Sequence, residues 1–275
     1  MITKRIIDEK GIDQTEDTVL VLGYFDGLHK GHQALFEKAR EIAAEQGLKI
    51  AVMTFPESPK LAFVRYQPEL MLHLASPEDR MAQLESLGVD YLYLIDFTSH
   101  FAGNTARDFF EKYVSRLRAK AVVAGFDYHF GSDRKESHEL RDYFNGKIVI
   151  VPSVNLDNRK ISSTRIRETI AVGDMLKTQE LLGYPLSTRG IVVHGNARGR
   201  TIGYPTANLA PLDRVRLPGD GVYVADVEHN GQRYRGMASV GKNVTFDGDE
   251  LRFEVNIFDF SQDIYGDTIR IFWLD

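Results

Sequence analysis

Two histidines and three glycines are concentrated in one short segment near the start of the chain. Residues 23–32 read GYFDGLHKGH, directly after the apolar run TVLVL of residues 18–22. Residues 33–46 then carry apolar side chains at the spacing of an amphipathic helix. A strand, a glycine turn and a helix N-terminus together offer unpaired backbone N–H groups and a positive dipole end. The segment therefore predicts a binding site for the phosphates of a nucleotide.

His29 and His32 are three residues apart, so both rings face the same side of the first helical turn. As a metal pair they would need a third ligand, and the neighbouring Asp26 precedes the turn. We therefore expect the histidines to contact phosphate. The alternative is a purely structural turn, in which the glycines permit the bend and the histidines cap the helix.

The whole segment resembles the GxFDGxHxGH signature of nucleotidyltransferases in the form found in bacterial FAD synthetases. Its seven specified positions match by chance at a given site only about once in 10^9 tries. The resemblance implies that His29 and His32 stabilise charge on the phosphates of ATP. It also implies nucleotide contacts from the neighbouring motif residues Gly23, Phe25, Asp26, Gly27 and Gly31.

Two later segments support this interpretation. Residues 125–131 read GFDYHFG and follow a predicted strand, and ligands bind at the carboxyl ends of strands in open α/β folds. Residues 161–167 read ISSTRIR and begin a predicted helix with groups that bind phosphate, although such a serine run is more often a plain N-cap. Both segments resemble flavin and nucleotide contacts of FAD synthetases. The resemblance implies flavin binding by Phe126 and Asp127 and nucleotide binding by Ser163, Thr164 and Arg165, with Asp127 and Arg165 positioning the substrate.

A second glycine-rich segment lies in the C-terminal part of the chain. Residues 195–208 read GNARGRTIGYPTAN. Glycines let the backbone approach phosphate, and a threonine hydroxyl and an asparagine carbonyl can supply neutral oxygen ligands to a nucleotide-bound Mg²⁺. Glycine spacing alone would equally fit a barrel loop with a proline turn. The segment resembles the glycine-rich and PTAN elements of riboflavin kinases, which implies nucleotide binding by Gly195, Gly199 and Gly203 and Mg²⁺ binding by Thr206 and Asn208.

Glu254, within LRFEVNIFDF, matches the position of the general base in riboflavin kinases. A ribityl hydroxyl is protonated at neutral pH, so a carboxylate base is useful in the kinase reaction. The phosphate of FMN, with a second pKa of about 6, is already largely ionised and needs no base. The alternation of Glu254 with Phe253 and Val255 also fits an ordinary solvent-facing strand residue.

The N-terminal part alternates predicted strands with predicted helices. This pattern indicates a Rossmann-like parallel sheet with helices on both faces. Further strands are expected at residues 48–55, 90–96, 120–125 and 147–152, and helices at residues 77–87, 105–117, 135–144, 163–171 and 175–182. Gly183 and Pro185 end the last of these helices, so we place the boundary there and expect domains over residues 1–184 and 185–275.

Short β runs replace the helices from Arg189 onward. Residues 223–229 and 232–240 are joined by Asn230-Gly231, a pair typical of a type I′ hairpin. Residues 251–260 and 268–273 alternate polar and apolar side chains, so we expect a small antiparallel barrel. Riboflavin kinases continue into a further helix after the barrel, and the resemblance implies a flavin pocket that lacks this closing helix here.

Composition fits an intracellular enzyme with more than one domain. A chain of 275 residues is near the size limit of a single core. The net charge of −5 is spread without long runs of one sign, which disfavours nucleic-acid partners and a polybasic membrane anchor. The chain has no cysteine, its first residues lack the apolar core of a signal peptide, and no apolar run approaches membrane-spanning length. We expect a cytoplasmic protein that acts on small molecules, and the sequence does not indicate its oligomeric state.

The two sets of motifs occur in one chain. They imply a bifunctional enzyme that phosphorylates riboflavin to FMN and adenylylates FMN to FAD, with ATP and Mg²⁺. Two alternatives remain at this point: an FAD synthetase with an impaired kinase half, and a non-catalytic flavin-binding regulator. The presence of His29, His32, Thr206, Asn208 and Glu254 counts against the regulator, which has little use for a base and a metal pair.

Overall fold

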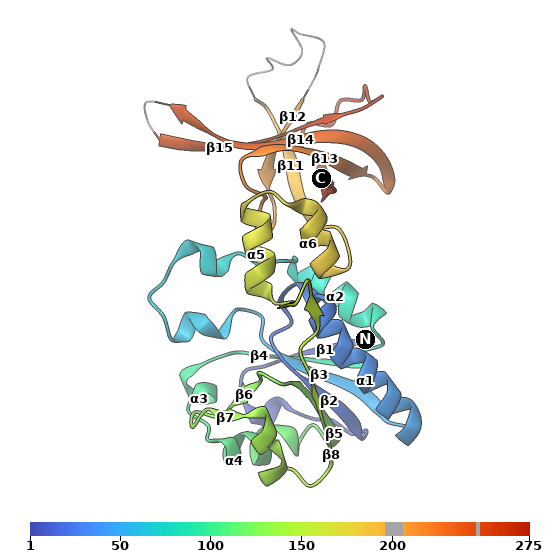
Figure 1. Cartoon of the computed structure of the whole chain (residues 1–275), viewed down its shortest axis with the longest axis vertical. Helices are drawn as coiled ribbons and strands as arrows, with labels where there is room; N and C mark the ends of the chain where they lie inside the picture. The colour runs from blue at the N-terminus through green and yellow to red at the C-terminus, as the bar shows by residue number, and fades with distance from the viewer. Residues whose placement is uncertain (196–205, 246–247) are drawn as a thin grey trace. The chain divides into compact units, whose positions relative to one another are not determined.

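The computed structural model describes residues 1–195, 206–245 and 248–275. It divides into two compact units, and each is described here by itself. The first unit comprises Met1–Met71 and Pro77–Ile161, and the second comprises Leu72–Ser76 and Ser162–Asp275. Figure 1 colours the chain from blue at the N-terminus to red at the C-terminus.

A six-stranded sheet lies at the centre of the first unit (Figure 1), and all its neighbouring strands are parallel. The strand order is β1-β4-β3-β2-β5-β8. These strands are β1 (Ile2–Ile6), β2 (Thr18–Leu22), β3 (Lys49–Thr54), β4 (Tyr91–Ile95), β5 (Ala119–Gly125) and β8 (Lys147–Val151). Every residue of β2 is buried, as expected for a parallel strand covered on both faces.

The side chains of β2 alternate between two hydrophobic cores. Val19 and Val21 belong to a core with the apolar stripe of α1 (Lys30–Gln46) and with Leu84 of α2 (Pro77–Ser86). Leu20 and Leu22 belong to the other core, with aromatic side chains of α3 (Ser99–Ala102), α4 (Ala106–Phe109) and the π-helical turn η5 (Phe110–Val114). The two cores confirm the predicted parallel sheet with helices on both faces.

Two helix predictions in this unit need correction. Residues 105–117 do not form one regular helix, because α4 passes into η5, where Ser115 N–H donates to the Phe110 carbonyl at 2.9 Å. This wider turn lets Phe109, Phe110, Tyr113 and Val114 all reach the core. Residues 135–144 begin as β7 (Lys135–Glu136), paired with β6 (His129–Phe130), and continue as a 3₁₀ turn, η6 (Ser137–Asp142). Only Ser137 and Leu140 of η6 are buried, too little to support a longer helix.

The remaining short elements of the first unit connect the sheet and its helices. They are four further 3₁₀ turns and a second small hairpin: η1 (Glu9–Gly11), η2 (Asp26–Leu28), η3 (Pro59–Ala62), η4 (Pro68–Met71), β9 (Asn155–Leu156) and β10 (Arg159–Lys160). The sequence did not predict either small hairpin or β1. β1 joins the edge of the sheet through β4, so its pairing depends on a partner far along the chain.

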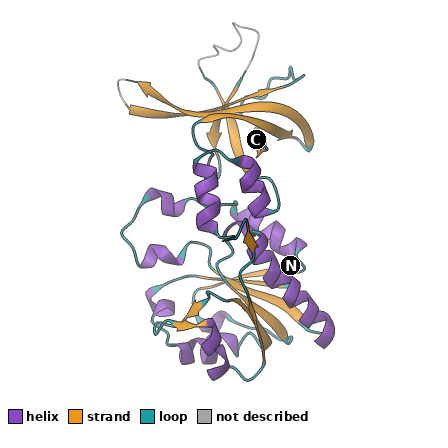
Figure 2. Cartoon of the chain, viewed as in Figure 1, coloured by secondary structure: helices purple, strands orange, loops and turns teal. Residues whose placement is uncertain are grey.

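The second unit begins with two helices and ends in a closed antiparallel barrel; Figure 2 separates the helices from the strands by colour. The helices are α5 (Ser163–Ala171) and α6 (Met175–Leu182), as predicted. The barrel order is β11-β12-β15-β14-β13-β16. Its strands are β11 (Ser187–Val193), β12 (Ala207–Pro211), β13 (Gly221–His229), β14 (Gln232–Thr245), β15 (Gly248–Ile257) and β16 (Thr268–Trp273).

The hairpin between β13 and β14 has the predicted turn. Asn230 and Gly231 both have positive φ, 49° and 76°, as a type I′ turn requires.

Trp273 lies in the barrel core, where its indole N–H donates to Thr188 Oγ1 at 3.1 Å. The predicted small antiparallel barrel is confirmed. Within the described parts of both units, no helix is long and apolar enough to cross a membrane.

Candidate active sites

The turn between β2 and α1 has an unusual backbone. Phe25, Gly27 and Leu28 all have positive φ, at 57°, 75° and 37°. Such angles are uncommon for Phe and Leu and tend to persist at functional sites, where the surrounding structure enforces them. Both side chains are almost completely buried in the core that covers β2 and α1, which holds the turn in place.

His29 and His32 stack on each other at the N-terminus of α1. Their ring centroids lie 3.6 Å apart with an interplanar angle of 14°. His29 is the N-cap of α1, and its Nδ1 accepts a hydrogen bond from the His32 backbone N–H at 3.3 Å. Phe25 meets the His32 ring edge-on at 5.3 Å. The structure therefore brings the two predicted histidines together at the N-terminus of α1, which is the positive end of the helix dipole.

The electrostatics of His32 favour a neutral ring. Part of the residue remains exposed, but its Nδ1 atom is enclosed and has no hydrogen-bond partner among the described residues. Burial, with smaller contributions from the charges of His29 and Lys160, holds the pKa of His32 well below its usual value. A neutral imidazole can still donate one N–H to a phosphate oxygen.

Gly23 allows the close approach on which this arrangement depends. A Cβ atom at Gly23 would lie 2.6 Å from Cζ of the Phe25 ring, a distance that real Cβ contacts do not show. The same ring packs against His32, so a larger residue at position 23 would disturb the histidine pair indirectly.

Arg80, on α2, is a buried residue beside this turn that the sequence analysis did not single out. Its guanidinium donates to the Phe55 carbonyl at 3.0 Å and lies 5.8 Å from the centroid of the Tyr24 ring. Burial lowers the pKa of Arg80, opposed by the charges of Tyr24, Asp26 and Glu57. The spacing in the sequence could have predicted its burial, because Arg80 and the buried Leu84 are four residues apart and share a helix face. Arg80 therefore ties the turn after β2 to the end of β3.

Phe126 and Asp127 lie directly after β5, as predicted for the segment at the end of that strand. Both are largely exposed. Lys160 on β10 contacts both, with its Nζ 2.5 Å from Asp127 Oδ2 and 4.5 Å from the centroid of the Phe126 ring. Lys160 was not among the residues predicted from the sequence, because it lies in a different segment from both partners.

The predicted nucleotide residues of α5 belong to the second compact unit. Ser162 is the N-cap of α5, and its hydroxyl accepts from the Arg165 backbone N–H at 3.3 Å. The capping role considered for this serine run is therefore present. Ser163 and Thr164 follow in the first turn, and Arg165 is almost fully buried.

In the barrel, Asn208 and Glu254 are directly opposite each other on β12 and β15. Ser239 of β14 is the partner of Glu254 on its other side. Phe253 and Val255 are buried, while Glu254 is half-buried. The pairing places a carboxylate beside an amide on the partly exposed face of the barrel sheet.

Gly195 lies against the side chain of Asn208. A Cβ atom at Gly195 would lie 2.2 Å from Nδ2 of Asn208, so only glycine permits this approach of the backbone. Gly199 and Gly203, also predicted to bind nucleotide, lie outside the described residues.

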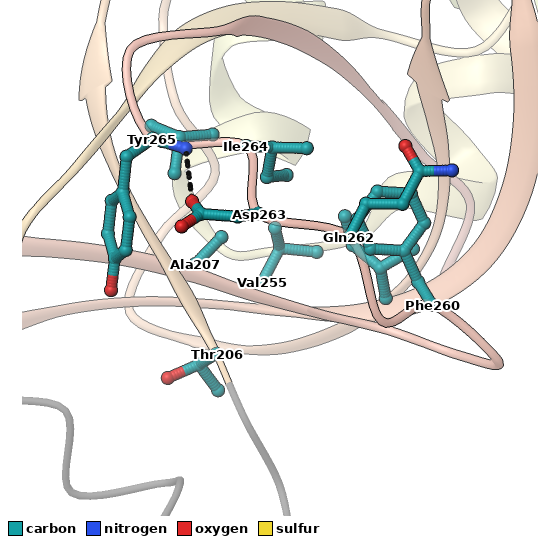
Figure 3. Close-up of a pocket in the computed structure, with 10 residues that line it drawn as sticks. Thr206, Ala207, Val255, Phe260, Gln262, Asp263, Ile264 and Tyr265 are labelled. Atoms are coloured by element: carbon teal, nitrogen blue, oxygen red, sulfur yellow. Dashed lines mark hydrogen bonds between the residues drawn. The ribbon is translucent and has the colours of Figure 1, made fainter.

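A pocket lies beside the start of β12 (Figure 3). Its walls combine apolar and polar side chains, and Asp263 accepts a hydrogen bond from the Tyr265 backbone N–H at 3.2 Å. Thr206 is at the edge of the group drawn in Figure 3. The described lining residues are Val192, Thr206, Ala207, Val255, Ile257, Phe260, Gln262, Asp263, Ile264 and Tyr265. Of the predicted metal pair, Thr206 thus borders this pocket and Asn208 faces Glu254.

The first unit has a parallel α/β sheet and a glycine turn of the kind that binds phosphate. The barrel has its own glycine-rich segment and a carboxylate. Together these features define a two-part nucleotide-dependent transferase. The sequence pattern of the FAD synthetase family matches residues 11–165, and that of the riboflavin kinase family matches residues 182–275. The chain belongs to the family of bifunctional riboflavin kinase/FMN adenylyltransferases.

Individual relatives agree with this assignment. The bifunctional riboflavin kinase/FMN adenylyltransferase of Listeria monocytogenes is 40% identical over 259 residues, which cover 93% of this chain and 82% of the relative. The Bacillus subtilis enzyme of the same name is 38% identical over 267 residues, covering 95% and 84%. A crystal structure from Streptococcus pneumoniae, described as a macrolide-efflux protein, has a TM-score of 0.97 and 58% identity, covering 100% of this chain and 90% of the other.

The protein is therefore an enzyme with both riboflavin kinase and FMN adenylyltransferase activities. Its substrates are flavins and ATP. The bifunctional activity predicted from the two sets of motifs is confirmed, in place of a non-catalytic flavin-binding regulator.

Proposed function

We propose that adenylyl transfer takes place at the turn between β2 and α1, and that riboflavin phosphorylation takes place at the barrel. The observation that carries the first assignment is the stacked pair His29 and His32 at the N-terminus of α1. We retain residue 184 as the end of the adenylyltransferase part, so that this part includes α5 and α6.

In the adenylyl transfer, the phosphate of FMN attacks the α-phosphate of ATP and pyrophosphate leaves. The attacking phosphate is largely ionised at neutral pH, so the site needs charge stabilisation and not a base. His29, His32 and the backbone around Gly23, Phe25, Asp26, Gly27 and Gly31 would hold the phosphates of ATP. The low pKa of His32 fits a neutral ring that donates a hydrogen bond.

The other predicted residues of this reaction would position the two substrates. Phe126 offers an exposed aromatic face, and Asp127 an exposed carboxylate, on the flavin side. Ser163, Thr164 and Arg165 at the start of α5 offer hydroxyl and guanidinium groups to phosphate. Holding FMN and ATP in the reactive orientation would account for a large part of the rate.

In the kinase reaction, Glu254 would accept the proton of the ribityl hydroxyl as this oxygen attacks the γ-phosphate of ATP and ADP leaves. Its position opposite Asn208 supports this role, because it places the carboxylate beside a predicted nucleotide contact. Gly195, together with Gly199 and Gly203, would contribute backbone contacts to the phosphates.

Mg²⁺ would bind at the barrel through Thr206 and Asn208. The donor set fits, because a hydroxyl and an amide oxygen are hard, neutral ligands that suit a Mg²⁺ held mainly by ATP phosphates. The described residues contain no cluster of three His, Cys, Asp or Glu side chains that could hold a metal by themselves. When bound, the ion would neutralise charge on the transferred phosphate.

A single assay separates these assignments. Riboflavin or FMN is incubated with ATP, with and without Mg²⁺, and riboflavin, FMN and FAD are separated by chromatography. Formation of FMN from riboflavin should depend on the barrel residues, and formation of FAD from supplied FMN should depend on the residues around α1. We further propose a cytoplasmic enzyme without nucleic-acid or membrane partners, because the net charge of −5 is spread without long runs of one sign.

A further inference from the structure

Lys160 connects two parts of the adenylyl-transfer site. Its ammonium group pairs with Asp127 at 2.5 Å and lies over the Phe126 ring at 4.5 Å. The following residue, Ile161, has its carbonyl oxygen 3.5 Å from the position of a Cβ on Gly31, in the first turn of α1. Lys160 therefore lies between the predicted flavin segment and the histidine pair.

The charge of Lys160 also acts on His32. It contributes to the lowered pKa of that ring, after burial and the charge of His29. A neutral His32 can donate a hydrogen bond but adds no positive charge to the site. The reaction brings the anionic phosphate of FMN beside the anionic phosphates of ATP, and a permanent positive charge between them lowers the repulsion.

The present partner of Lys160 is easily exchanged. The side chains of Lys160 and Asp127 are 40% and 57% exposed, and an ion pair at that exposure contributes little to stability. A lysine ammonium on a flexible four-carbon stem can move to a new partner without a change in the backbone. A doubly charged phosphate competes well against one solvated carboxylate.

We propose that Lys160 leaves Asp127 when FMN binds and contacts the phosphate of FMN, holding it beside the α-phosphate of ATP. The placement beside Phe126 and Asp127 assigns the lysine to the FMN phosphate and not to the pyrophosphate end of ATP. The inference rests on the proposed location of adenylyl transfer at His29 and His32.

The test compares Lys160→Met, which keeps the length and removes the charge, with Lys160→Arg, which keeps the charge. Lys147→Met is a matched control, because Lys147 pairs with Glu45 at 2.7 Å and its side chain is also 40% exposed. The rates of FAD formation are measured against FMN and against ATP concentration. Riboflavin phosphorylation in the same preparations reports on the integrity of the chain.

We expect Lys160→Met to lower kcat/KM for FMN by about 10²-fold, as for loss of one charge stabiliser. The KM for ATP and the rate of riboflavin phosphorylation should stay near wild type. Lys160→Arg should recover FAD formation to within about tenfold of wild type. Lys147→Met should change FAD formation by less than about twofold.

The inference is overturned if Lys160→Met behaves like Lys147→Met, or if Lys160→Met changes only the KM for ATP. It is also overturned if Lys160→Arg is as impaired as Lys160→Met, or if Lys160→Met lowers FAD formation and riboflavin phosphorylation together. His32→Ala, measured in parallel, distinguishes a wrong role for Lys160 from a wrong location for the adenylyl-transfer site. If His32→Ala stops FAD formation and Lys160→Met does not, only the role of Lys160 is wrong. If neither variant affects FAD formation, the location of the site is wrong.

Discussion

The imidazole rings of His29 and His32 stack at 3.6 Å between centroids, and the ring nitrogen of His29 caps the backbone N–H of His32. The pair is therefore fixed by the first turn of α1 before any substrate binds. Preorganised donors of this kind stabilise developing charge without reorganisation during the reaction.

Replacing either histidine by alanine should lower the rate of FAD formation by on the order of 10²-fold, because each variant loses one preorganised donor. FMN formation from riboflavin should persist, because the barrel residues assigned to the kinase reaction belong to the second compact unit. The measurement is chromatography of flavin products with FMN and with riboflavin as substrate. Equal loss of both activities in a folded variant would refute the assignment of two sites.

The reciprocal variants lie in the barrel. Thr206→Ala, Asn208→Ala and Glu254→Gln should each stop or strongly slow FMN formation, because they remove the proposed metal ligands or the proposed base. Adenylylation of supplied FMN should remain near normal. Ser239→Ala is a useful control, because Ser239 is also paired with Glu254 but has no assigned role. Loss of FAD formation from supplied FMN in these variants would contradict the division of labour.

Gly23→Ala should impair FAD formation although it adds only one methyl group. The new Cβ would fall 2.6 Å from the Phe25 ring, and the displaced ring would disturb His32. We expect a loss of stability of about 1–3 kcal/mol, typical of overpacking, together with a lower rate. Gly11→Ala is the matched control, because its Cβ would meet the side chain of Ile6 at an ordinary 3.6 Å. Equal behaviour of the two variants in thermal unfolding and in FAD formation would show that the approach at Gly23 is unimportant.

The lowered pKa of His32 predicts a specific dependence of stability on pH. Below a pH of about 6.5 the unfolded chain binds a proton at His32 that the folded protein does not, so unfolding becomes more favourable as pH falls. This group can contribute a slope of up to about 1.4 kcal/mol per pH unit below that pH and none well above it. Denaturant unfolding of the wild type and of His32→Asn is measured from about pH 7.5 to about pH 5.5, a range that brackets the ordinary histidine pKa of about 6.5. The two slopes of unfolding free energy against pH are then compared. A steeper or equal slope in His32→Asn would contradict the prediction.

The single tryptophan gives an independent probe of the barrel. Trp273 is fully buried and donates to Thr188 Oγ1. Thr188→Val should destabilise the barrel by about 1–3 kcal/mol, because the indole N–H loses its acceptor in the core. Thr188→Ser keeps the hydroxyl and should recover part of this loss. Tryptophan fluorescence during thermal unfolding measures both variants, and an unchanged transition in Thr188→Val would show that the hydrogen bond is unimportant.

Local sequence was sufficient for features that depend on neighbours along the chain. The spacing of His29 and His32 fixed their common side of the helix, since residues three apart are adjacent on a helical turn. The pair Asn230-Gly231 predicted the hairpin between β13 and β14, because both residues accept positive φ. The prediction of a helix over residues 135–144 was wrong, because only Ser137 and Leu140 of the 3₁₀ turn η6 are buried in the folded unit. Their local pattern did not show that burial would be limited to a single turn.

Only the tertiary structure decided which distant residues meet. The register between β12 and β15 places Asn208 opposite Glu254, and a shift of one residue would turn one of them to the other face. The hairpin of β9 and β10 carries Lys160 to Asp127, and α2 carries Arg80 to the end of β3. The motifs identified the candidate chemical groups, because side-chain type and local spacing can be read from the sequence alone. Strand register and helix packing determined which of these groups meet. Register and packing depend on burial and backbone pairing between segments that are far apart in the sequence.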